Sequence, residues 1–132
     1  MKYRAEIEIE KPIEELKNSY SKDILKWHKD IIKHELIEGE RGKINAKYHV
    51  ITEQNGQFIE NVIKIVKVIN DNEWWIEIDK ENDFKMLKKL SFHVIGLNKT
   101  KVVEDYELEL ISFKNNINKA LNSFKEFSEN KT

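Results

Sequence analysis

Histidine and carboxylate side chains are the residues of this chain whose types could support catalysis or metal binding. The histidines are His28, His34, His49 and His93, and none has the spacing of a zinc-binding motif. Solvated or structural imidazoles are therefore the simpler interpretation, and no catalytic metal is expected. The absence of cysteine excludes thiolate metal sites, disulfides and a cysteine nucleophile. No nucleotide-binding loop or serine-hydrolase motif occurs, so no cofactor is expected.

Glu104 differs from the other carboxylates, most of which alternate outward along predicted strands and so form a solvated face. Its same-face neighbours are Val102, Tyr106, Leu108 and Leu110. A carboxylate among them would lie inside an apolar cavity or at its rim. There it would anchor a ligand or act as a base with a raised pKa. The alternative is that it reaches a cation or water at the rim.

A histidine partner for Glu104 depends on the turn that precedes its strand. If Asn98-Lys99 is a two-residue turn, Glu104 lies opposite His93 and the two form a candidate acid–base dyad. If residues 97–99 form the turn, Glu104 lies opposite Phe92 and His93 points to solvent. A slip of one residue exchanges the two faces of the strand. The second register buries more apolar surface and is favoured, so no catalytic residue is assigned. This second register buries Leu90, Phe92 and Val94.

Alternating apolar residues predict most of the elements that would position these groups. A strand is expected at Lys2–Glu10, with Tyr3, Ala5, Ile7 and Ile9 on one face. A helix follows Pro12, whose missing N–H is tolerated in a first turn. A second short helix holds Ile24, Leu25 and Trp27. Further strands are expected at 31–38, 43–53, 86–96 and 100–111.

Two turn signals predict the pairing in the middle of the chain. Asn55-Gly56 is typical of a two-residue hairpin and pairs Tyr48 with Ile63, Val50 with Asn61 and Thr52 with Ile59. Asp71-Asn72 predicts a second hairpin that pairs Ile65 with Ile78, Lys67 with Ile76 and Ile69 with Trp74. Both give one inner face that is apolar apart from Thr52, Asn61 and Lys67. The outer face then carries an apolar band of Ile51, Phe58, Val62, Val66, Val68 and Trp75.

The end of the chain has helical spacing, with Ser112 as a predicted N-cap. Its apolar residues are Phe113, Ile117, Ala120, Leu121, Phe124 and Phe127. A long antiparallel sheet with one apolar face needs a cover, and this helix is the element large enough to provide it. The predicted class is α+β, with about seven strands wrapped around a long C-terminal helix and two short helices between the first two strands. Residues 1–132 are expected to form a single domain.

Three segments resemble the START/SRPBCC superfamily, which includes polyketide cyclase-like proteins. They are EIEIEKPIEEL at 6–16, KWHKDIIKHELIEGERGKINAK at 26–47 and GLNKTKVVEDYELEL at 96–110. The resemblance spans nearly the whole chain and implies the helix-grip fold. It also implies a cavity between the sheet and the long helix that holds a hydrophobic small molecule. Some members that this chain resembles catalyse cyclisation or dehydration in that cavity.

The expected ligand-binding residues combine aromatic walls with a few polar groups. Tyr48, Asn61 and Tyr106 would offer hydrogen bonds to a mostly apolar ligand, although phenols satisfied by backbone groups are an equal alternative. Trp27 would plug one end of the cavity. The full set is Trp27, Tyr48, Asn61, Trp74, Phe92, Glu104, Tyr106 and Phe124.

The leading interpretation is a cytoplasmic protein that binds a small apolar or aromatic molecule. The net charge of −1 gives no electrostatic argument for nucleic acid, and no segment is apolar enough for stable membrane insertion. A homodimer through the outer apolar band is a further expectation. The alternatives are a cyclase, dehydratase or hydrolase acting on a polyketide-like substrate, and an interaction module with a filled cavity. A cavity of roughly 300 Å³ or more would favour a small-molecule site.

Overall fold

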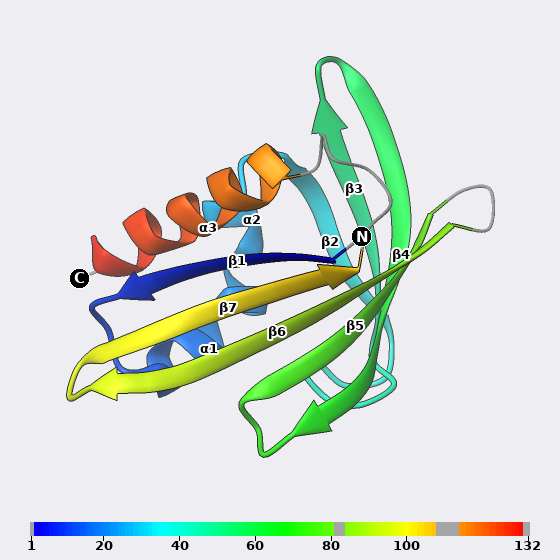
Figure 1. Cartoon of the computed structure of the whole chain (residues 1–132). Helices are drawn as coiled ribbons and strands as arrows, with labels where there is room; N and C mark the ends of the chain where they lie inside the picture. Colours follow the sequence, from blue (N-terminus) through cyan, green and yellow to red (C-terminus); the bar gives the residue numbers. More distant parts are fainter. Residues whose placement is uncertain (1, 81–83, 108–113, 131–132) are drawn as a thin grey trace.

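A curved, seven-stranded antiparallel sheet is the main element of the structure, a computed structural model that describes residues 2–80, 84–107 and 114–130 (Figure 1). The strand order across the sheet is β1-β7-β6-β5-β4-β3-β2. The predicted architecture is confirmed. The strands are β1 (Lys2–Ile9), β2 (Ile31–Glu38), β3 (Lys47–Gln54), β4 (Gln57–Ile69), β5 (Glu73–Lys80), β6 (Phe84–Gly96) and β7 (Lys99–Glu107).

Two short helices, α1 (Ile13–Lys22) and α2 (Ile24–Trp27), connect the two edge strands of the sheet. Pro12 precedes α1, and two glutamates in the first turn suit the positive end of the helix. Helix α3 (Lys114–Glu129) contacts β1 and α2, and Figure 1 shows it on the opposite side of the molecule from β4 and β5. The predicted N-cap Ser112 lies outside the described residues. No helix among the described residues is long and apolar enough to span a membrane.

The β3–β4 hairpin has the predicted register. Asn55 and Gly56 both have positive φ, as the turn that matches the twist of a two-residue hairpin requires. Tyr48 pairs with Ile63, and Val50 pairs with Asn61. Strand β3 starts later than predicted, at Lys47 rather than residue 43, because the chain turns at Asn45 with a φ of 71°. Ile44, which lies within the predicted strand but before the observed one, is consequently 55% exposed.

The predicted register of the β4–β5 hairpin is wrong. Asn70 and Asp71 both have positive φ, and Ile69 pairs with Glu73. A β-bulge between Ile65 and Lys67 adds one residue to β4 and restores the inward face. The pairs that result are Lys67–Trp75, Val68–Trp74, Ile65–Ile76 and Ile63–Ile78. The bulge places Lys67 on the outer face and packs Val68 against the inner one, the reverse of both predictions.

The β6–β7 hairpin keeps the predicted faces but changes the partners. Glu104 lies opposite Leu90, two residues away from the predicted Phe92, because the turn is Leu97-Asn98 and the register shifts once more between Val94 and Gly96. Leu90 and Phe92 are buried as predicted, and His93 is exposed. The alternative dyad of His93 and Glu104 therefore does not form. Val94, predicted to be core, is 65% exposed near the hairpin tip.

The apolar interior consists of two clusters. The larger one joins α1, α2 and α3 to strands β1, β6 and β7, and includes Ile9, Leu16, Val102, Leu121 and Phe124. The smaller one lies on β3, β4 and the residue before β3, and consists of Ala46, Tyr48, Val50 and Ile65. Trp74 packs against both clusters. The sheet is therefore covered by helix at one end and leaves space at the other.

Candidate functional site

A cavity of about 250 Å³ lies between the two apolar clusters. Its wall is mostly apolar and combines residues of both clusters, such as Tyr48 and Val50 of one with Leu90 and Phe92 of the other. The volume is a little below the roughly 300 Å³ at which ligand pockets usually begin. The cavity therefore fits a small ligand rather than a long lipid chain.

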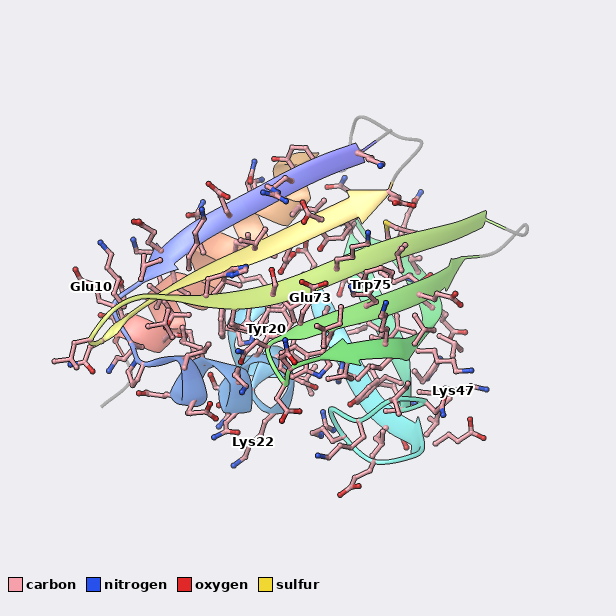
Figure 2. The ribbon with its side chains drawn as sticks, turned by 60° about the horizontal axis from the view of Figure 1, so that its bottom comes forward. Glu10, Tyr20, Lys22, Lys47, Glu73 and Trp75 are labelled. Atoms are coloured by element: carbon pink, nitrogen blue, oxygen red, sulfur yellow. The ribbon has the colours of Figure 1, made fainter. Side chains whose placement is uncertain are left out.

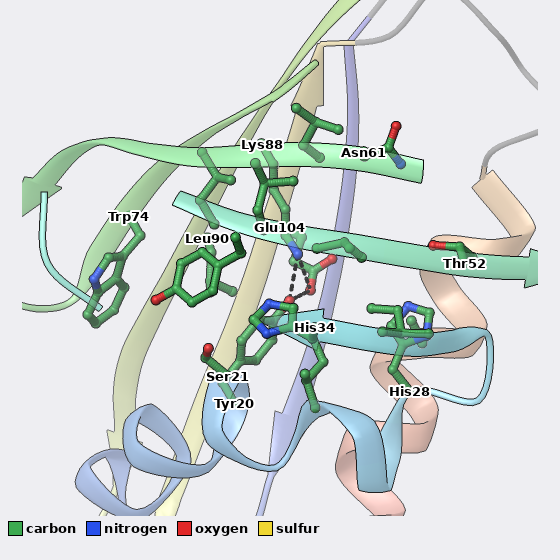
Figure 3. A pocket seen from close by; sticks show the side chains of 18 of the residues that line it. Tyr20, Ser21, His28, His34, Thr52, Asn61, Trp74, Lys88, Leu90 and Glu104 are labelled. Atoms are coloured by element: carbon green, nitrogen blue, oxygen red, sulfur yellow. Dashed lines mark hydrogen bonds and ion pairs between the residues drawn. The ribbon is translucent and has the colours of Figure 1, made fainter. Parts of the chain in front are cut away.

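The polar centre of the cavity is a buried cluster built around Glu104 (Figure 3). The Glu104 side chain is 2% exposed. Tyr20 donates a hydrogen bond to its Oε2 over 2.6 Å, and Tyr106 donates one to its Oε1 over 2.6 Å. Lys88 places its Nζ 3.6 Å from Oε2 and donates a 2.6 Å hydrogen bond to the Tyr20 hydroxyl. Both carboxylate oxygens are therefore occupied, and the charge of Glu104 is balanced by Lys88.

The two phenols remain protonated donors. Burial raises the pKa of Tyr20 and of Tyr106 well above 10, and the negative charge of Glu104 raises both further. The four residues come from α1, β6 and β7, so they meet only in the folded chain. Glu104 therefore does not present a free carboxylate to the cavity, because both of its oxygens accept hydrogen bonds from the phenols.

Two histidines at the cavity are kept neutral by their surroundings. Burial, followed by the charges of Arg41 and Lys88, lowers the pKa of His34 to about 4. Burial also lowers the pKa of His28, with Lys88 as the second cause. The backbone N–H of Asp30 donates to His28 Nδ1 over 3.3 Å. Both rings are therefore uncharged at neutral pH.

The loop between β2 and β3 contributes Gly42 to the cavity wall. Its Gly42 N–H donates to the Tyr48 hydroxyl over 2.9 Å, and the Trp74 indole donates to the Gly42 carbonyl over 3.0 Å. Arg41 reaches from this loop to α1, where it donates to Ser21 Oγ over 2.8 Å. The polar side-chain atoms of Tyr48 and Trp74 are thus already hydrogen-bonded to the backbone of the loop. For Tyr48 this matches the alternative that backbone groups satisfy core phenols.

Aromatic packing fills the other side, under α3. Trp27 is buried and donates its indole N–H to the Tyr20 carbonyl over 2.9 Å. The ring of Phe124 lies 4.8 Å from that of Trp27 and 5.1 Å from that of Tyr20, measured between centroids. Phe124 is fully buried in this packing and is not among the residues that line the cavity.

The other seven predicted ligand-binding residues do line the cavity, although their role in binding stays a prediction. The sequence reasoning missed Tyr20, His34 and Lys88. Lys88 carried a usable signal, since it precedes the inward-facing Leu90 and Phe92 by two and four residues. Tyr20 lies on the helix predicted after Pro12, but its contact with Glu104 spans 84 positions and has no local signal.

The outer face of the sheet is only partly apolar. Phe58 is 65% exposed and Val62 is 38% exposed. The ring of Trp75 lies under two cations, with Lys67 Nζ 4.5 Å and Lys89 Nζ 4.2 Å from its centroid. Its indole donates to Glu73 over 2.6 Å (Figure 2). Cations and a carboxylate therefore interrupt the predicted apolar band.

Comparisons with known proteins find similarity in structure. No family model and no curated protein matches the sequence. Major latex-like protein 151 from Panax ginseng is 13% identical, with a TM-score of 0.77 and 97% of each chain covered. A START superfamily protein from Mycobacterium smegmatis is 13% identical, with a TM-score of 0.75 over 95% of this chain and 97% of that one. The di-domain ARO/CYC StfQ from the steffimycin biosynthetic pathway is 11% identical, with a TM-score of 0.80; it is matched over 98% of this chain and 44% of its own.

These likenesses, together with the strand order and the helices, show that the chain has the predicted helix-grip fold.

Proposed function

We propose that this protein binds a small, mostly apolar molecule in the cavity between the two apolar clusters. The observation that carries the proposal is the cavity itself, about 250 Å³ with a mostly apolar wall and a few buried polar groups. Ligand sites commonly combine these features. The fold supports the proposal, since its neighbours include a START superfamily protein. Ligand binding, a single domain over residues 1–132 and a cytoplasmic location remain predictions.

The experiment uses two neighbouring residues of β4 that point in opposite directions. Ile63 lines the cavity, whereas the adjacent Val62 is exposed on the outer face. We expect Ile63→Phe to fill the cavity and weaken binding of an apolar fluorescent probe by about tenfold or more, the equivalent of ~1.4 kcal/mol. Val62→Phe adds a similar volume and should leave the affinity unchanged. Equal affinities in the two variants would contradict the proposal.

Native mass spectrometry of the protein purified from its own cells is the complementary measurement. A retained small molecule that is lost from Ile63→Phe but kept by Val62→Phe would place the natural ligand in the cavity. Its mass would name its chemical class.

An enzyme of the cyclase, dehydratase or hydrolase type is the second candidate. Glu104 and Lys88 line the cavity, and a structural neighbour is described as an ARO/CYC protein. A general base needs a carboxylate that can reach the substrate proton. Both oxygens of Glu104 already accept phenol hydrogen bonds, so binding without catalysis is the better-supported function. The interaction module with a filled cavity is third, because the cavity is open.

A further inference from the structure

Two buried polar atoms on the cavity wall have no partner within the protein. Among the described residues, His34 Nδ1, Asn61 Oδ1 and Ser128 Oγ are the buried side-chain atoms without a hydrogen bond. His34 and Asn61 line the cavity, whereas Ser128 does not. Native proteins pair nearly all buried polar atoms, because an unpaired one keeps the cost of its lost hydration. Two such atoms on one cavity wall therefore point to groups that a ligand would satisfy.

His34 and Asn61 lie in one row across the sheet. His34 on β2 pairs with Val50 on β3, and Val50 pairs with Asn61 on β4. Directly paired residues share a face, so all three side chains project toward the cavity. Two strand spacings separate the backbones of His34 and Asn61 by about 9–10 Å. The row thus presents a polar group at each end and an apolar valine between them.

The charges on the cavity wall balance. The described lining residues include two lysines, Lys17 and Lys88, and two carboxylates, Asp30 and Glu104. Lys88 lies beside Glu104, and Lys17 pairs with Glu14 over 3.2 Å. The two histidines are neutral because burial lowers their pKa values. Both lining lysines are already paired, so an anionic ligand would enter this apolar space without a free counter-charge among the described lining residues, and a ligand without negative charge is favoured.

We propose that the cavity selects a small neutral molecule with an apolar middle and a hydroxyl group at each of two ends, one held by His34 and the other by Asn61. This inference rests on the proposed function. It adds the positions of the polar groups on the ligand and the two residues that would hydrogen-bond to them.

Hydroxyl groups suit both ends for a chemical reason. A neutral imidazole nitrogen either donates or accepts, according to its tautomer, and Asn61 Oδ1 accepts. A hydroxyl both donates and accepts, so it satisfies either nitrogen state of His34 and also the amide of Asn61. A carbonyl or ether oxygen can only accept and would leave Asn61 Oδ1 unpaired.

The test is calorimetric titration with naphthalene, its mono-hydroxyl derivative and the derivative with one hydroxyl on each ring. Each neutral hydrogen bond contributes enough for about a 3–10-fold gain in affinity. We expect one such gain for each hydroxyl in the wild-type protein. Asn61→Leu and His34→Phe should each remove one of the two gains. His49→Phe changes a histidine that is paired with Glu60 rather than lining the cavity, and should keep both gains.

The outcomes separate this inference from the proposed function. If none of the three compounds binds, the proposed function fails. If all three bind with equal affinity, the cavity binds ligands but the two-hydroxyl pattern is wrong. A naphthalene with a carboxylate on each ring should bind more weakly than naphthalene, and tighter binding would overturn the neutral-ligand inference.

A second measurement uses only the wild-type protein and so does not depend on whether the variants fold. The ¹⁵N resonance of His34 Nδ1 should shift when the dihydroxyl compound binds and should stay nearly unchanged with naphthalene. Identical responses to the two compounds would contradict the role of His34.

Discussion

Beneath α3, the inward-facing residues of the sheet are fully packed, whereas on β4 and β5 residues of the same type remain partly exposed. Ile9 and Val102 have no exposed surface in the larger cluster. Ile63, Ile76 and Ile78 also face inward but line the cavity and are only half-buried. The alternation of apolar residues is the same in both halves. The difference comes from what covers them, since α3 packs on β1 and lies on the side of the molecule away from β4 and β5 (Figure 1).

This comparison teaches that apolar patterning specifies a face but not whether the face is filled. In the packed half, each apolar side chain gains its full burial from a neighbour. In the hollow half, side chains of the same type are only partly buried by protein neighbours, and a bound ligand would bury the remaining surface. The polar residues follow the same division. Glu104 at the boundary is fully hydrogen-bonded, while His34 and Asn61 in the hollow half contain unpaired atoms.

The largest expected effect is in the packed half. Phe124→Ala should lower the free energy of unfolding by about 3–5 kcal/mol, because it leaves a cavity between Trp27 and Tyr20. Ile63→Ala in the hollow half should cost about 2 kcal/mol, the lower end for its type, because its side chain already borders empty space. Urea unfolding measures both. Equal costs would remove the distinction between the two halves.

The boundary between the halves is tested by Glu104→Gln. Removing the carboxylate charge leaves Lys88 buried without a counter-charge, which should cost about 3 kcal/mol, at the lower end for a broken buried pair. The double variant Glu104→Gln/Lys88→Met removes both charges and should recover much of that loss. Urea unfolding of the two variants and of Lys88→Met completes the cycle. A loss below about 1 kcal/mol in the single variant would show that the pair is solvated.

A smaller effect is expected from pH in the hollow half. The pKa of His34 is about 4 in the folded protein and 6.5 in the unfolded chain. Above pH 6.5 both states hold neutral imidazole, so His34 adds no pH dependence. As the pH falls from 6.5 to about 4, only the unfolded chain takes up a proton, and stability is lost. The loss should be about 1–3 kcal/mol, below the full linkage value because the ring is partly exposed.

Unfolding of wild type and His34→Gln near pH 7 and pH 4.5 isolates this contribution. The acid loss should be smaller in the variant, because the remaining titrating groups are common to both proteins. Equal losses would show that His34 titrates normally in the folded protein.

The smallest effect concerns the outer face, where a homodimer remains a prediction. Phe58 is the most exposed aromatic of the predicted band, while the ring of Trp75 is already occupied by Lys67 and Lys89. We expect a weak dimer in sedimentation velocity at high concentration, which Phe58→Ser should abolish without changing stability by more than about 0.5 kcal/mol. A monomer at all concentrations would contradict the prediction.

The sequence by itself determined the element order, the faces of most strands and the β3–β4 register. These features depend on neighbouring residues: period-two alternation, the turn at Asn55-Gly56 and the helical spacing around Phe124. The aromatic and polar residues of the cavity wall could be predicted in the same way, because they share a face with known core positions. Lys88 was accessible to this reasoning and was missed.

Only the tertiary structure decided the bulges, the polar cluster and the cavity. A bulge adds one residue that the turn signals do not show, which is one reason why the partner of Glu104 could not be counted from its turn. The partner of Trp74 differs from the prediction because residues 70–72 form the turn of the β4–β5 hairpin. The cluster of Tyr20, Lys88 and Glu104 joins three elements that are distant along the chain. The cavity exists because α3 lies along β1 rather than over β4 and β5, and the position of a helix on a sheet depends on the packing of the whole chain.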